Sequence, residues 1–491
     1  MSMSSTQRWL LALTATAALM ISLDALVVTT ALHAIAVDLH ASIADLEWTV
    51  NAYTLPFAVL LMAGAALGER YGRRRVLVAG LALFGITSAG CALAPGLGWL
   101  IAARAVQGAG AAAVAPTALA VLSASVGPEQ RPRALGLFAS ITGLATAGGP
   151  LVGGAVVQYL TWQWIFWLNV PIAAVLIVAV LARIEPDAGT PRRLDVLGTA
   201  LVSAAAFGIV WALIRGNDVG WTSPEVLAAA VGGVLALVLF VGWELRADAP
   251  LVPMRLFATP AFSAGNAAGF LLFACTFSGA FFFAQFFQVV SRHGPFATGV
   301  LLLPWTVTLF VVAPIAGAQV TRIGARTLVS AGLTLQAVGF GWIAFVAGPG
   351  TSYAWLVAPF VLSGVGLSAA IPSAQNAVIG SVPPSAIGAA SGTFNTVRQL
   401  GGAFGIAITT AVFTARGGLG SATSFSDGFT PAIAAAALLA LLGAATGLLL
   451  PGRTPRGAAP AVGGPRPAGE RPRGERPESA HAGRTEDRLT G

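Results

Sequence analysis

Residues 100–154 read LIAARAVQGAGAAAVAPTALAVLSASV, then the basic link GPEQRPRAL, then GLFASITGLATAGGPLVGG. Two apolar segments, each long enough to cross a bilayer, flank a short charged turn, and this pattern predicts a transmembrane hairpin. The first segment contains Arg104, and a charge at bilayer depth costs about 2.5–3.5 kcal/mol unless it finds a partner or a polar cavity. The second contains glycines and Pro150, which permit close packing and bending of helices. The stretch therefore predicts a polar pathway between closely packed, movable helices.

The composition of the whole chain extends this prediction. Its 491 residues are 56% hydrophobic and 9% charged, with a mean hydropathy of +0.80, so a soluble globular protein is excluded. All 27 basic residues are arginine, and without lysine no phosphate-binding P-loop can form. We interpret the net charge of +8 as cytoplasmic arginine near the membrane and exclude nucleic acid as a partner. The lipid bilayer is the expected partner.

No pattern of residues predicts a cofactor, a metal site or an enzyme. Cys91 and Cys275 lie in apolar segments without metal-ligand spacing, and the four histidines are scattered along the chain. We therefore expect neither catalytic residues nor a bound metal or cofactor.

Hydropathy predicts an all-α membrane protein with fourteen spans, near residues 9–32, 47–68, 76–94, 98–126, 134–158, 165–184, 194–214, 224–245, 262–289, 298–320, 327–347, 353–379, 388–415 and 430–450. Loops after even-numbered spans are rich in arginine, whereas the opposite loops hold Arg215, Arg292, Arg416 and several acids, among which we place Glu47. The bias predicts that both termini are cytoplasmic. Residues 452–491 are rich in Pro, Gly, Ala and Arg, which predicts a disordered cytoplasmic tail.

A weak internal repeat predicts two similar halves. Residues 66–77 resemble 318–328 at an offset of 252, so that Gly72 matches Gly324, and a second offset of 256 pairs Gly149 with Gly405. The expected units are a six-helix bundle over 1–184, two inserted helices with their linkers over 185–258, a second six-helix bundle over 259–451 and the tail over 452–491.

Five stretches carry a family resemblance: LGERYGRRR (67–75), LIAARAVQGAGAA (100–112), GGPLVGG (148–154), TWQWIFWLNVPI (161–172) and LDALVVTTAL (23–32). They resemble the motifs of the major facilitator superfamily, in its fourteen-helix drug:proton antiporter branch. LGERYGRRR (67–75) resembles the loop motif GxLaDRxGRK, although Ala65 and Glu69 replace its first glycine and its aspartate. The resemblance implies a gating role for the loop, while positive-inside charge on a glycine turn is the simpler alternative. Its candidate residues are Glu69, Arg70, Gly72, Arg73 and Arg74.

LIAARAVQGAGAA (100–112) resembles RxxqGxgaa, which implies that Arg104 takes part in proton coupling; the alternative is an arginine that extends to the outer interface. GGPLVGG (148–154) resembles the antiporter motif GPxxGG, with Gly149, Pro150, Gly153 and Gly154, and favours export over uptake. TWQWIFWLNVPI (161–172) is similar to WRWIFxxNxP.

LDALVVTTAL (23–32) resembles LDxTVVNVAL and retains Asp24, which we interpret as the acid well inside a span. An ordinary aspartate pKa of about 3.9 is low for proton carriage, but desolvation raises carboxylate pKa values. Asp24 and Arg104 are the expected coupling pair, and the alternative for Asp24 is a static partner of a buried arginine.

Tyr53, Gln107 and Arg398 are candidates for lining the substrate cavity, and the phenylalanines of 281–287 are more simply explained by helix packing. The resemblance implies the major facilitator fold and a monomeric antiporter in the plasma membrane that exports lipophilic, drug-like molecules, cations among them, in exchange for protons. An uptake symporter and a membrane-embedded sensor of small molecules stay open as alternatives.

Overall fold

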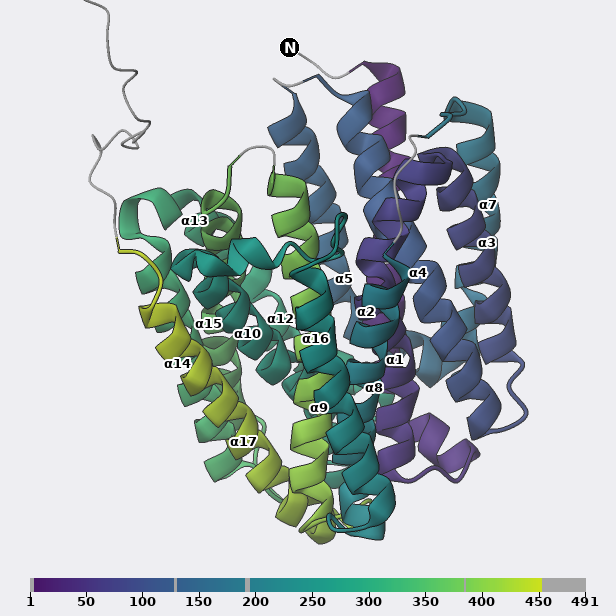
Figure 1. The fold of residues 1–491 in the computed structure, drawn as a ribbon. Coiled ribbons are helices and arrows are strands. Elements are labelled where there is room, and N and C mark those ends of the chain that lie inside the picture. Colours follow the sequence, from purple (N-terminus) through teal and green to yellow (C-terminus); the bar gives the residue numbers. More distant parts are fainter. Residues whose placement is uncertain (1–3, 128–129, 190–194, 384–385, 453–491) are drawn as a thin grey trace, which may run out of the picture. The chain divides into compact units, whose positions relative to one another are not determined.

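The computed structural model describes residues 4–127, 130–189, 195–383 and 386–452. Helices account for nearly all of this part of the chain (Figure 1). The N-terminal half comprises α1 (Ser5–Asp38), α2 (Ile43–Tyr71), α3 (Arg73–Ala92), α4 (Leu97–Ser125), α5 (Arg131–Tyr159), α6 (Trp164–Trp167) and α7 (Asn169–Arg183). The inserted pair is α8 (Val196–Val219) and α9 (Pro224–Glu244).

The C-terminal half begins after the short helix η1 (Met254–Ala258). It comprises α10 (Pro260–Gln285), the π-helical turn η2 (Phe286–Val290), α11 (Pro295–Leu301), α12 (Leu303–Thr306), α13 (Thr308–Ile323), α14 (Ala325–Val346), α15 (Ala354–Gly380), α16 (Ile387–Thr414) and α17 (Ala422–Leu448).

Local chemistry determines where several helices begin. The hydroxyls of Ser4 and Ser42 each accept a hydrogen bond from the backbone of the third helical residue, whose side chain bonds back to the serine nitrogen. Such capping boxes satisfy backbone groups that the helix itself leaves unpaired. Asp195, Ser223 and Ser421 cap α8, α9 and α17 in the simpler, one-sided way.

Twelve helical segments within the described residues are long and apolar enough to cross a membrane. They do not include α5 and α16, which have 29 and 28 residues and coincide with two of the predicted spans. Both are rich in glycine and small residues, which suit contact with other helices better than contact with lipid. The all-helical membrane architecture is confirmed, while the count of fourteen spans stays a prediction.

Two predicted spans are interrupted. The segment at 165–184 divides at Leu168 into α6 and α7, and that at 298–320 divides into α11, α12 and α13. Pro304 is the second residue of α12, and because proline lacks an N–H it cannot continue the hydrogen-bond ladder of α11. The boundaries of the predicted bundles stay predictions, and of the predicted tail only residue 452 lies within the described residues.

The predicted repeat is visible in the backbone as two turns of the same conformation. Gly72 joins α2 to α3 with φ +94°, and Gly324 joins α13 to α14 with the same φ. Only glycine adopts this conformation without strain. The first helix of each half also packs closely on the parallel helix that contains the matched glycine, α1 on α5 and α10 on α16.

The inserted pair lies against both halves. Helix α8 packs on α2 and on α16 (Figure 1), and an apolar cluster joins the three helices through Leu55, Val210 and Ala407. The phenylalanines of 281–287 are buried among other rings: the centroid of Phe283 lies 5.0 Å from that of Phe360 and 5.2 Å from that of Phe340. Packing therefore explains them.

Candidate functional site

The site is centred on an ion pair between Asp24 of α1 and Arg104 of α4. Arg104 Nη1 donates to Asp24 Oδ2 at 2.5 Å, and the two residues are 3% and 0% exposed. The two residues are 80 positions apart in the chain. An arginine that extends to the interface does not fit this burial, so that alternative is wrong.

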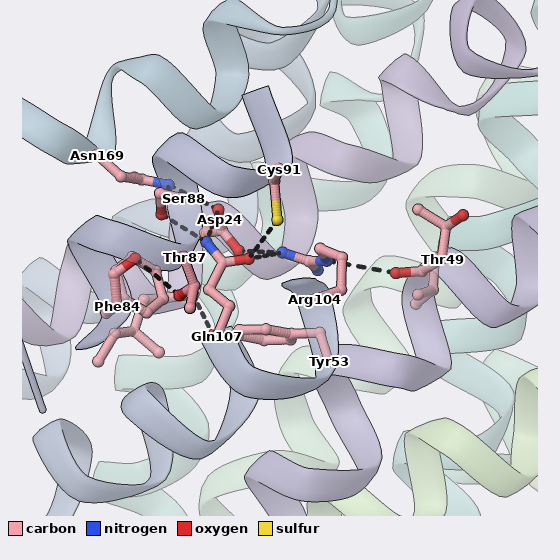
Figure 2. A network of polar contacts seen from close by, with 12 residues as sticks. Asp24, Thr49, Tyr53, Phe84, Thr87, Ser88, Cys91, Arg104, Gln107 and Asn169 are labelled. Atoms are coloured by element: carbon pink, nitrogen blue, oxygen red, sulfur yellow. Dashed lines mark hydrogen bonds and ion pairs between the residues drawn. The ribbon is translucent and has the colours of Figure 1, made fainter. Parts of the chain in front are cut away.

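Amide side chains complete the coordination of the carboxylate (Figure 2). Asp24 Oδ1 accepts hydrogen bonds from Asn169 Nδ2 at 2.7 Å and from Gln107 Nε2 at 3.2 Å. Gln107 Oε1 accepts from Arg104 Nη1 at 2.7 Å, and Gln107 Nε2 also donates to Ser88 Oγ at 2.7 Å. Residues from α1, α3, α4 and α7 therefore share one buried polar network.

The guanidinium group is held from α2 as well. Arg104 Nε donates to the carbonyl of Thr49 at 3.3 Å, and Arg104 Cζ lies 4.2 Å from the ring centroid of Tyr53. The Tyr53 hydroxyl donates to the carbonyl of Ile21 at 3.2 Å, which fixes the ring between α1 and α2. Tyr53 and Gln107, predicted to line a substrate cavity, thus contact the ion pair directly.

Glycines of α4 make the close approach of these helices possible. A methyl group added at Gly110 would lie 2.9 Å from the backbone nitrogen of Phe84 on α3. One added at Gly108 would collide with the carbonyl of Tyr53 on α2. The same motif that carries Arg104 and Gln107 therefore brings their neighbours within hydrogen-bonding distance.

This arrangement makes the attachment of α1 to α4 depend on the charges of the pair. A buried ion pair loses most of its stabilisation when one partner is neutralised, because the other charge is then left unpaired in a medium of low polarity. Loss of either charge would therefore weaken the attachment of α1 to α4. A group that binds a proton more tightly in one of two conformations shifts the equilibrium between them.

The predicted gating loop at the α2–α3 junction is fastened by an acid that sequence reasoning missed. Asp187, in the segment after α7, accepts hydrogen bonds from the backbone nitrogens of Arg73 at 2.8 Å and Arg74 at 3.2 Å. Partial burial would raise the pKa of Asp187, but these backbone hydrogen bonds outweigh it and lower the pKa below its usual value. Gly72 is buried here with φ +94°, as a tight turn requires.

Arginine side chains of the loop contact the ends of neighbouring helices. Arg74 Nη2 donates to the carbonyl of Leu181 on α7 at 2.7 Å, and Arg73 Nη1 to that of Ala120 on α4 at 3.5 Å. Glu69 is half-buried and Arg70 is exposed. The loop therefore fastens α3 to α4 and α7.

The predicted antiporter motif lies at two close helix contacts. A methyl group at Gly153 would lie 2.5 Å from Thr30 Oγ1 and 2.8 Å from the carbonyl of Val27, both on α1. At Gly154 it would collide with the carbonyl of Pro295 on α11. The first glycine thus packs α5 within its own half, and the second brings α5 against the C-terminal half.

The other two residues of the antiporter motif also lie at close contacts between helices. Gly149 and Pro150 are buried, and a methyl group at Gly149 would lie 2.7 Å from Leu26 Cβ on α1. The carbonyl of Pro150 faces Gly299 of α11. The whole motif is therefore a surface on which α1 and α11 pack.

Comparisons with known proteins agree with these motifs. The family model of the Major Facilitator Superfamily matches residues 13–406 and 269–477. The chain belongs to the major facilitator superfamily. Among curated relatives, the Tetracenomycin C resistance and export protein of Streptomyces glaucescens is 34% identical over 82% of this chain and 74% of that one. The Cephamycin export protein CmcT of Amycolatopsis lactamdurans is 36% identical over 87% and 90%, respectively.

A third relative, the Methylenomycin A resistance protein of Streptomyces coelicolor, is 35% identical over 91% of this chain and 92% of its own length. A solved POT family transporter, in complex with 5-aminolevulinic acid, shares the fold with a TM-score of 0.67 at 12% identity, over 89% of this chain and 94% of that one. The predicted major facilitator fold and its drug-efflux branch are confirmed. This major facilitator is a multi-pass membrane transporter with a small-molecule substrate.

Arg398 of α16, the third residue predicted to line the substrate cavity, makes no contact with the ion pair among the described residues. It is half-buried, its Cζ lies 5.0 Å from the ring centroid of Phe273 on α10, and its Nε has no hydrogen-bond partner among the described residues. Its role in the cavity stays a prediction.

Sequence reasoning missed Ser88 and Asn169, which contact the network from α3 and α7. Asn169 lies in the stretch 161–172 that resembles a family motif, so a signal for it was present; Ser88 is an ordinary residue of an apolar helix. The placement of Glu47 in an outer loop was wrong: it is the fifth residue of α2 and fully buried. Within the described residues no group of three or more His, Cys, Asp or Glu residues could hold a metal ion.

Proposed function

We propose that this major facilitator is a proton-coupled antiporter that exports lipophilic, drug-like molecules or antibiotics across the plasma membrane. The observation that carries the proposal is the buried Asp24–Arg104 pair, in which a titratable carboxylate joins two helices of the N-terminal half. Protons enter at Asp24 from outside, the pair separates, and the halves change their relative tilt around a site near the middle of the membrane.

The direction of transport is supported by two features. The relatives are named for resistance and export. The antiporter motif of α5 also brings the two halves into contact, at Gly154 and Pro295. From the arginine bias of the loops we infer that both termini lie in the cytoplasm, and we expect the monomer to be the transporting unit.

Transport assays in membrane vesicles test this proposal. Everted vesicles that contain the protein are energised to acidify the lumen, and uptake of tetracenomycin C, a cephamycin and methylenomycin A is measured. We expect proton-dependent accumulation of at least one compound, together with alkalinisation of the lumen when it is added. Accumulation in right-side-out vesicles instead would show an uptake symporter, and binding without flux would show a sensor.

A further inference from the structure

Glu47 is a buried acid outside the ion-pair network. It is 0% exposed near the start of α2, its Oε1 accepts from Asn51 Nδ2 at 3.2 Å, and its Oε2 has no hydrogen-bond partner among the described residues. None of the ion pairs in the described part of the chain includes it. A buried, ionised carboxylate without a counter-ion is strongly unfavourable, so this environment suits the neutral acid.

Among the described residues, the helices around Glu47 present no cation that pairs with it. From α16, the hydroxyl of Thr410 faces the carboxyl group without completing a hydrogen bond of standard geometry. From α8, the charge that acts on Glu47 is that of another acid, Asp218. The other charged groups nearby are already engaged: Arg215 pairs with Asp218, Arg104 pairs with Asp24, and Asp45 caps its own helix.

The contact lies where the two halves and the inserted pair meet. Helix α2 belongs to the N-terminal half and α16 to the C-terminal half. The side-chain amide of Asn217 on α8 donates to the carbonyl of Ala411 and, at 2.7 Å, to the hydroxyl of Thr414. These are the helix ends that the arginine bias places outside the cell. Separation of α2 from α16 at this end would expose Glu47 to external water.

We propose that Glu47 is a second proton-binding residue, distinct from Asp24, whose protonation holds the outer end of the α2–α16 interface closed. The proposal rests on the alternating-access antiporter proposed above, and it adds a residue that controls the opening of the outer end of that antiporter. When that end opens, the hydrated carboxyl releases its proton to the external water. When a proton binds again to Oε2, the neutral acid can be buried and its O–H can donate to Thr410.

Thermodynamic linkage gives the expected sign. Because the closed state binds one proton more than the open state at Glu47, acid favours closure, and the ratio of closed to open molecules changes by at most about tenfold per pH unit. Glutamine at this position keeps the size and the burial but cannot ionise, so it should hold the end closed at every pH.

Distances between spin labels test this proposal. The labels are placed at Ala44 of α2 and the exposed Ala415 after α16, in the full-length protein in lipid nanodiscs, with the buried Cys91 and Cys275 replaced by alanine. Pulsed-EPR distance distributions are recorded between about pH 5.5 and 8.5. With Glu47 we expect the short-distance population to fall severalfold as the pH rises; in Glu47→Gln it should stay dominant.

The matched control is Glu225→Gln, which removes an exposed acid from the neighbouring α9 and should reproduce the wild-type pH response. If Glu47→Gln does not fold, Glu47→Asp should retain a pH response with a displaced midpoint. An unchanged response in Glu47→Gln, or no response in the parent protein, would overturn the proposal. The measurement uses neither substrate nor gradient, so its outcome is independent of whether the vesicle assays support export.

Discussion

Asp24→Asn removes the negative charge of the buried pair and keeps the shape of the side chain. The asparagine oxygen can still accept hydrogen bonds from Asn169 and Gln107, which lie 2.7 and 3.2 Å from Asp24 Oδ1. Arg104, which is 0% exposed, then has no counter-ion. An uncompensated buried charge costs about 3–5 kcal/mol, so we expect this loss in the free energy of unfolding.

A second substitution separates the structural role of the pair from its transport role. Asp24→Asn with Arg104→Gln removes both charges, so most of the lost stability should return, because replacing a whole buried pair by neutral groups is close to neutral. Transport should not return, since no carboxylate remains at the site. Asp24→Glu should transport with an altered pH dependence.

The driving force sets the scale of the transport assay. One proton that enters down 100 mV and one pH unit releases about 3.7 kcal/mol, which supports a gradient of roughly 500-fold for a neutral substrate exchanged one for one. Everted vesicles with the wild-type protein should build up a substrate gradient that is a fraction of this limit, and vesicles with Asp24→Asn should build up none. Wild-type accumulation by Asp24→Asn, at equal membrane abundance, would refute proton coupling at this residue.

Four further predictions concern other regions. Gly154→Ala should abolish transport by separating α5 from α11, whereas Gly148→Ala, which meets nothing within 4 Å, should retain it in the same vesicle assay. Asp187→Ala should lower thermal stability by about 1 kcal/mol through loss of a helix cap, and asparagine should restore much of it. Because the pKa of Asp187 is lowered by folding, its contribution is present above about pH 4 and is lost as the pH falls through the folded-state pKa. A cysteine at Asp218 should react with an impermeant thiol reagent from outside the cell; reaction only from the cytoplasmic side would contradict the topology. Truncation after Arg453 should leave membrane abundance and transport unchanged, and loss of transport at normal abundance would show that the tail has a role.

Hydropathy and motif spacing in the sequence determined the membrane class, the approximate spans and the superfamily. Composition is decisive for these features, because a bilayer requires long apolar segments with internally paired backbones. The repeat was also readable, since a turn with positive φ requires glycine at Gly72 and again at Gly324. Both Asp24 and Arg104 stood out individually as charges in apolar segments.

Only the tertiary structure decided which groups meet. The pairing of Asp24 with Arg104 depends on how α1 packs on α4, and the participation of Asn169 depends on α7. Glu47 lies so near the end of an apolar segment that hydropathy assigns it to a loop, although it belongs to α2 and is completely buried in the folded chain. Spacing within one helix is a local property that the sequence specifies directly, whereas contacts between helices far apart in the chain arise from the packing of many side chains together.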